Sequence, residues 1–214
     1  MSRVAPLVLL GLALASCAGS LFKNKAAPPT MYRLSPAANS SPADPASEAR
    51  LIDLAVLRPR VRTGLDTDRI AALYPDRRMD YFADVRWSGP LDAVLQELAV
   101  QEFHVNSSLR HVSAEASVFA SPYWLEIEVT DFQAEYPVAG GPPTVHVRLQ
   151  ARIGSAADRR VLARFEPDVR EAASGNRMSA IVDAYNRAAD KALTEIAQGA
   201  VQTLAPKAVS APGP

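Results

Sequence analysis

The segment Leu125-Glu126-Ile127-Glu128-Val129-Thr130 alternates apolar with polar, mostly acidic, side chains. Successive side chains of a β-strand point to opposite faces, so this pattern predicts a strand with one buried and one solvated face. The segment Val145-His146-Val147-Arg148-Leu149-Gln150-Ala151-Arg152-Ile153 repeats the pattern with basic side chains on the polar face. Two such strands favour an antiparallel sheet that buries one face.

We expect these two strands to pair across the loop of residues 137–143, which contains three prolines and Gly140-Gly141. In that register Glu126 and Glu128 would face Arg148 and Arg152, and each exposed pair would contribute only tenths of a kcal/mol. The glycine pair is interpreted as a turn, because no helix follows it to hold a phosphate.

Further strands are expected on either side of this pair. The nearly continuous apolar run 51–57 predicts a buried strand that ends at Arg58-Pro59, and segments 69–74 and 79–87 predict a hairpin around the turn 75–78. The segment 161–165 predicts a return strand, and the alternating residues 31–34 predict a short edge strand.

Two amphipathic helices complete the pattern. Pro90 suits the first turn of a helix capped by Ser88 or Gly89, and the apolar side chains at helical spacing are Leu91, Val94, Leu95 and Leu98. A long helix is expected over residues 178–204, with the buried stripe Met178, Ile181, Val182, Tyr185, Ala189, Leu193 and Ile196. The sequence thus predicts an α+β fold, a two-layer sandwich of a mainly antiparallel sheet covered by two helices.

The N-terminus has the organisation of a secretory signal. Arg3 precedes an apolar run that is too short to span a bilayer, and small residues lead to Cys17. The order Leu14-Ala15-Ser16-Cys17 resembles the lipobox of bacterial lipoproteins. By that resemblance residues 1–16 are removed and Cys17 carries covalent diacylglycerol and an acyl chain, with no other cofactor expected. The alternative is an incidental cysteine in an ordinary signal.

Cys17 is the only cysteine of the chain, so an intrachain disulfide is impossible and acylation accounts for the odd thiol. Ala18 stands where an aspartate would resemble the inner-membrane retention signal of enteric bacteria. The expected address is therefore the periplasmic face of the outer membrane, with outer-membrane lipid as a partner.

Composition divides the rest of the chain. Residues 17–49 are rich in Pro, Ala and Ser and are interpreted as the lipidated N-terminus and a tether, with a reach of about 30 Å for a flexible chain. Residues 50–204 are expected to form the domain, and residues 205–214 a disordered tail. Lysines plus arginines and aspartates plus glutamates number 23 each, and no basic stripe suggests a nucleic-acid partner.

Catalytic chemistry finds little support. His104, His111 and His146 are interpreted as surface or strand-face side chains rather than a metal site, since no cysteine completes a ligand set. The pairs Asp66 with Asp68 and Asp80 with Asp84 are interpreted as solvated carboxylates. We therefore expect no catalytic residue, no metal site and no enzyme.

The two tryptophans are given different roles. Trp87 is expected in the core, at the junction between hairpin and first helix. Trp124 would point outward with Glu126 and Glu128 if Leu125 and Ile127 point inward, which makes it a candidate partner contact.

An ordered set of short motifs resembles the ABC-type transport auxiliary lipoprotein family, of the paraquat-inducible protein C type. These motifs are the lipobox, Tyr32-Arg33-Leu34, Leu57-Arg58-Pro59, Leu65-Asp66-Thr67-Asp68-Arg69-Ile70, Arg86-Trp87 and Val129-Thr130-Asp131-Phe132. The resemblance implies an outer-membrane partner of mammalian-cell-entry (MCE) domain proteins, which move lipids between membranes with an ABC transporter. It supplies no catalytic motif.

Other functions stay open on the sequence alone. The domain could be a periplasmic lipid carrier, which would need an apolar groove between sheet and helices, or a structural envelope lipoprotein. An undetected hydrolase is a further alternative.

Overall fold

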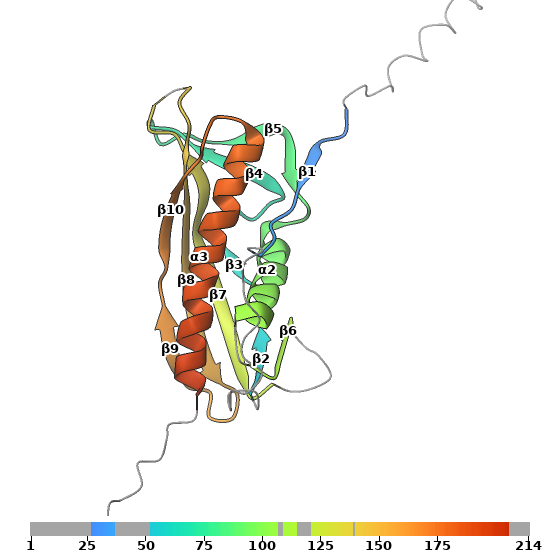
Figure 1. Cartoon of the computed structure of the whole chain (residues 1–214), viewed down its shortest axis with the longest axis vertical. Coiled ribbons are helices and arrows are strands. Elements are labelled where there is room, and N and C mark those ends of the chain that lie inside the picture. The colour runs from blue at the N-terminus through green and yellow to red at the C-terminus, as the bar shows by residue number, and fades with distance from the viewer. Residues whose placement is uncertain (1–26, 37–51, 107–108, 115–120, 139, 206–214) are drawn as a thin grey trace, which may run out of the picture.

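The computed structural model describes residues 27–36, 52–106, 109–114, 121–138 and 140–205. Within them ten strands form one sheet with two helices against it (Figure 1). In chain order the elements are β1 Thr30–Tyr32, β2 Asp53–Val56, β3 Arg60–Val61, β4 Arg69–Leu73, β5 Met79–Trp87, α2 Leu91–Asn106, β6 His111–Ala114, β7 Tyr123–Glu135, β8 Thr144–Ser155, β9 Val161–Phe165, β10 Asp168–Ala172 and α3 Met178–Leu204.

The antiparallel pair β7–β8 runs the length of the sheet. Its register places Glu126 opposite Arg152 and Glu128 opposite Gln150, and it shifts between Val129 and Asp131 at a β-bulge. The expected pairing is thus confirmed for Glu126 with Arg152. It is wrong for Glu128 and Arg148. In the register of Glu126 with Arg152, Glu128 faces Gln150, and the bulge then brings Arg148 opposite Asp131.

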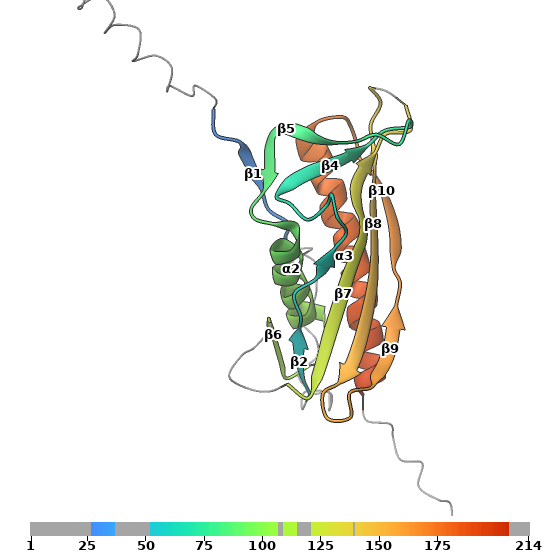
Figure 2. The same cartoon turned by 180° about the vertical axis from the view of Figure 1, so that it is seen from behind.

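Shorter strands pair with the outer edge of β7 and with the outer edge of β8 (Figure 2). The strands β2, β3 and β4 pair with β7 one after another, and all three are parallel to it. The chain from residue 53 to 73 therefore runs along β7 in the direction of that strand. Along β8 lie β9 and β10, both antiparallel. The sheet is therefore mostly antiparallel with some parallel pairs, and the predicted α+β class is confirmed.

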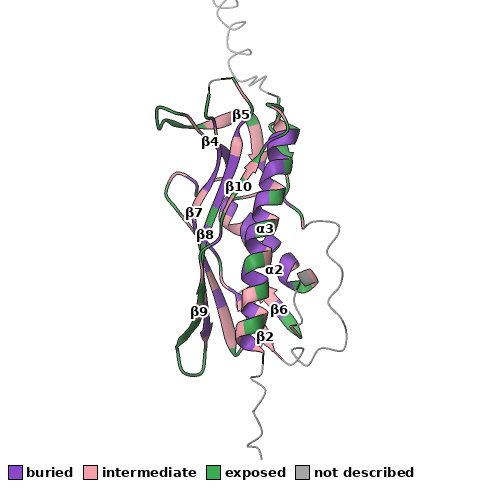
Figure 3. Cartoon of the chain, turned by 60° about the vertical axis from the view of Figure 1, so that its left-hand side comes forward, coloured by how far each residue is buried: buried purple, intermediate pink, exposed green. Residues whose placement is uncertain are grey.

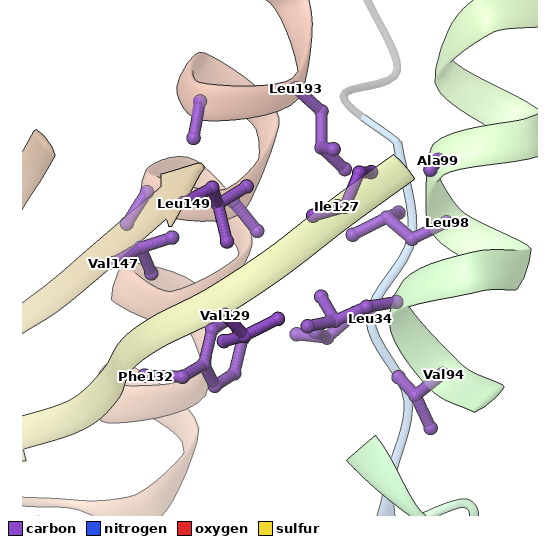
Figure 4. Close-up of a cluster of buried hydrophobic side chains, with 14 of the residues drawn as sticks. Leu34, Val94, Leu98, Ala99, Ile127, Val129, Phe132, Val147, Leu149 and Leu193 are labelled. Carbon is purple, nitrogen blue, oxygen red and sulfur yellow. The ribbon is translucent and has the colours of Figure 1, made fainter. Parts of the chain in front are cut away.

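Both helices lie on the same face of the sheet (Figure 3). The expected stripes are buried there, except that Met178 is only half-buried. Ile127 of β7 lies between Leu98 of α2 and Leu193 of α3 (Figure 4). Trp87 is 1% exposed and makes edge contacts with Phe132 and Tyr185, as expected of a core residue.

The first strand brings the N-terminal segment into the domain. β1 pairs in parallel with the second half of β5, and Leu34 just beyond it is only 3% exposed. The Ser35 amide donates to Asn186 Oδ1 of α3 over 3.1 Å. Part of the expected tether therefore belongs to the folded domain.

An irregularity in β5 separates the part that pairs with β4 from the part that pairs with β1. The register with β4 shifts so that residues 82–85 of β5 face Ile70 alone, and Asp84 has a φ of 55°. This left-handed residue bends the strand, and Val85 to Trp87 then accept β1. Asp80 and Asp84 are thereby placed on separate halves of a bent strand.

Two strands carry little sequence signal: β6, which pairs with β2, and β10. Residues 1–26 and 206–214, which hold the expected signal, Cys17 and the tail, lie outside the described residues. Neither helix of the described chain is both long and apolar enough to span a bilayer.

Candidate functional site

The face of the sheet turned away from the helices carries ionic side chains from β3, β7, β8 and β10, strands that can be followed in Figure 2. Near the middle, a Glu126 carboxylate oxygen lies 2.8 Å from Arg60, and the other lies 3.1 Å from Arg152. Further along, Arg148 lies 3.5 Å from Asp168, and Arg62 lies 3.9 Å from Asp131. We call this surface the outward face. Each of its ion pairs contributes little to stability, since most of the charged groups are partly exposed.

Trp124 stands at one end of the outward face, as its alternation with Leu125 predicts. It is half-buried, because its indole lies against Gly154 on the neighbouring strand; a Cβ at Gly154 would be 2.0 Å from Trp124 Cζ2. Gly154 in turn pairs with Val161 of β9, and Val161 and Leu162 are 41% and 39% exposed. We call this end of the sheet, with the partly exposed side chains of Trp124, Val161 and Leu162, the Trp124 end.

A buried histidine lies on the same face near the opposite end. His146 is 5% exposed, and its Nδ1 and Nε2 lie 2.9 Å from Glu135 Oε1 and 2.8 Å from Asp168 Oδ1. The imidazole thus links a carboxylate of β7 to a carboxylate of β10 through its two ring nitrogens. The expected strand-face position is confirmed, but the sequence did not reveal its burial or its partners.

Glu135 is the centre of this cluster. Burial opposes its ionisation, but hydrogen bonds from Arg170, His146 and Gln133 outweigh burial and hold the pKa of Glu135 below its ordinary value. The Gln133 amide donates to Asp131 and to Glu135, each over 3.1 Å. These bonds fix β7, β8 and β10 together, and a structural role accounts for the cluster.

A pocket of about 410 Å³ opens beside Glu135, at the end of the sheet away from Trp124. Its walls are mainly apolar and aromatic: Leu73, Tyr74, Pro75, Tyr136, Pro137 and Thr144, with Glu135 and Arg170 at one side. Tyr74 and Tyr136 stack at 5.3 Å, and the Arg78 guanidinium lies 4.5 Å from the Tyr74 ring centre. We call this the hairpin end, after the β4–β5 turn beside it.

The other sequence candidates form no shared centre. His104 and His111 are exposed, with ring centres 6.5 Å apart. Asp68 lies 3.4 Å from Arg86, and Asp80 lies 3.2 Å from Arg78. Among the described residues, no group of three metal-ligating side chains is present.

The chain is similar in sequence to a known protein family over most of its length. The model of the ABC-type transport auxiliary lipoprotein component matches residues 32–197, from β1 to most of α3. The chain belongs to this family. It is therefore a lipoprotein of ABC-type transport, with the membrane anchoring and periplasmic location that this implies. No functionally curated protein is similar enough in sequence to match it.

Solved structures share the fold. The crystal structure of protein XCC0632 from Xanthomonas campestris is 22% identical, with a TM-score of 0.68 over 81% of this chain and 96% of that one. An uncharacterized protein is 14% identical, with a TM-score of 0.64 over 81% and 99%. The hypothetical protein CT253 from Chlamydia trachomatis is 10% identical, with a TM-score of 0.50 over 72% and 98%.

Proposed function

We propose that this lipoprotein is the outer-membrane docking subunit of an MCE-type lipid transport system that an ABC transporter drives. Cys17, acylated after removal of residues 1–16, holds it at the periplasmic face of the outer membrane. The domain receives an MCE-domain protein that reaches across the periplasm. The observation that carries the proposal is the family match from β1 to α3, and the Leu14-Ala15-Ser16-Cys17 lipobox and Ala18 support the address.

The Trp124 end is the surface on which we place the MCE-domain partner. Large aromatic and aliphatic side chains at a partly exposed position are typical of interface centres. Trp124 lies on β7 and Val161 and Leu162 on β9, and these two strands flank β8 on either side. Paired charges such as Glu126 with Arg152 surround them and form a polar rim.

The fold supports a lipid carrier less well than it supports a docking subunit. A carrier with its groove between sheet and helices needs empty apolar space there, whereas buried side chains such as Leu98, Ile127 and Leu193 fill that layer (Figure 4). No observation favours the carrier, or a purely structural envelope protein, over docking. Both are outcomes of the test below.

The test is affinity purification from cell envelopes in mild detergent, with proteins and lipids identified by mass spectrometry. Wild type and Cys17→Ala should both recover an MCE-domain protein, with Cys17→Ala lost from the outer membrane. Trp124→Ala should lose the partner, and Met31→Ala, which changes an exposed apolar side chain of β1, is the matched control. Stoichiometric phospholipid without a protein partner would favour the carrier, and neither partner nor lipid would favour the structural protein.

A further inference from the structure

We infer that the hairpin end of the domain rests on the lipid surface of the membrane that holds the anchor. The surface consists of the β4–β5 turn with Arg77, Arg78 and Met79, the adjoining aromatic pair Tyr74 and Tyr136, and Val138 of the β7–β8 loop. The inference rests on the proposed lipidation of Cys17 and adds the orientation of the domain and a second membrane contact.

The point at which the anchor joins the domain supports this orientation. The chain enters β1 at the end that carries the β4–β5 turn and the β7–β8 loop, whereas α3 ends at the opposite end (Figures 1 and 2). From Cys17 to Thr30 a fully extended chain reaches at most about 45 Å, and a flexible one averages about 20 Å. The 27 residues of α3 make the domain about 40 Å long. The short connection therefore favours the hairpin end as the one nearest the membrane.

The chemistry of this end suits a bilayer interface. Val138 is 67% exposed and Met79 is 37% exposed, so both loops present aliphatic side chains to the outside. Behind them Arg78, Tyr74 and Tyr136 form a stack beside the pocket. Tyrosine is enriched at membrane interfaces because its ring is apolar and its hydroxyl is polar.

Hydrogen bonds join the two segments at their bases. The Tyr136 amide donates to the Leu73 carbonyl over 2.9 Å, which joins the end of β7 to the end of β4. The Tyr136 hydroxyl lies 2.8 Å from Asn176 Oδ1, and the Asn176 side-chain amide reaches the Gly140 carbonyl at 3.4 Å. The base of the β7–β8 loop is thereby joined to the end of β4 and to the segment before α3.

Charge near the anchor favours anionic lipid. The segment from Ala18 to Thr30 contains Lys23 and Lys25 and no acidic residue. A lysine near an anionic surface contributes about 1 kcal/mol of attraction. In the turn, Asp76 and Asp80 lie 3.7 and 3.2 Å from Arg78, so its charge is already paired. We therefore assign the turn an apolar contact with the lipid.

The experiment uses the full lipidated protein in vesicles of phosphatidylethanolamine and phosphatidylglycerol. Cys17 is the only cysteine, so Val138→Cys, Met79→Cys or Leu162→Cys introduces a single free thiol for an environment-sensitive fluorophore. Labels at 138 and 79 should shift to the blue on reconstitution and lose quenching by aqueous iodide. The label at 162, at the Trp124 end, should keep both properties unchanged.

Equal quenching at 138 and 162 in vesicles, with the Cys17 lipid confirmed by mass spectrometry, would overturn the lipid contact and leave the docking proposal intact. Protection at 138 in whole envelopes but not in vesicles would assign this end to a protein and also overturn it. An unmodified Cys17 thiol would overturn both the anchor and the orientation that rests on it.

Discussion

The indole of Trp124 occupies the space that a side chain at Gly154 would fill, directly across the β7–β8 pair. Gly154 is buried beneath it although it lies on the outward face. An aromatic ring that covers a cross-strand glycine restores the packing that the glycine lacks. The candidate partner contact is thus held in place by the sheet itself.

This relationship predicts a steric conflict in Gly154→Ala. The new Cβ would lie 2.0 Å from Trp124 Cζ2, so the indole must move outward, and we expect a loss of about 1–3 kcal/mol in unfolding free energy. Urea denaturation measures this loss of unfolding free energy. In a Trp124→Ala background the same change should cost far less. Gly175→Ala, where nothing lies within 4 Å of the new Cβ, is the control. Equal losses in both backgrounds would contradict the contact.

Leu34 predicts that the domain begins before residue 50. Its side chain lies among those of the core beside Val94 and Leu98 of α2 (Figure 4), and it is 3% exposed. Leu34→Ala should therefore cost about 2–5 kcal/mol of unfolding free energy. Met31→Ala, on the same segment but with Met31 54% exposed, should change it by less than about 0.5 kcal/mol. Thermal or urea unfolding compares the two, and equal effects would show that this segment does not pack in solution.

The Glu135 cluster predicts a stability that falls in acid. Because hydrogen bonds depress the pKa of Glu135, its contribution is present above the ordinary value of 4.5 and is lost as the pH falls through the lower folded-state value. Glu135→Gln should be less stable at neutral pH and should lose less stability on acidification than wild type. Urea unfolding at neutral and acid pH measures both slopes.

The control for this cluster is Glu128→Gln on the same strand. Glu128 lies 3.7 Å from Arg60, and its side chain is 44% exposed. The substitution should therefore leave the slope closer to that of wild type. A Glu135→Gln slope equal to that of wild type would show that the hydrogen bonds of Glu135 do not stabilise the ionised form in solution.

The features that sequence alone predicted are those with a strong local period. The alternation in β7 and β8 and the long apolar stripe of α3 fixed which side chains face the core, and Trp87 and Trp124 were placed correctly from them. Family membership was also predictable, because the short motifs occur in a characteristic order.

Contacts between residues far apart in the chain could not be predicted from the sequence. The bulge after Val129 places Arg148 opposite Asp131 instead of Thr130, and nothing in the local pattern marks it. The burial of His146 depends on Asp168, which reaches it from β10. The hairpin-end pocket joins the ends of β4 and β7, which lie some sixty residues apart in the chain. Such sites arise from topology rather than from periodicity.

Gly199 gives a prediction in which two effects have opposite signs. Alanine is a better helix former than glycine by about 1 kcal/mol, so a free position in α3 would be stabilised by Gly199→Ala. Here, however, a Cβ would lie 2.3 Å from Phe165 Cε1, because β9 packs closely against the helix. Since steric overlap in a packed site costs about 1–3 kcal/mol, we expect net destabilisation. In a Phe165→Ala background the sign should reverse, and urea unfolding of the four variants tests it. A Gly199→Ala variant that is more stable than wild type would mean that β9 and α3 lie further apart in solution.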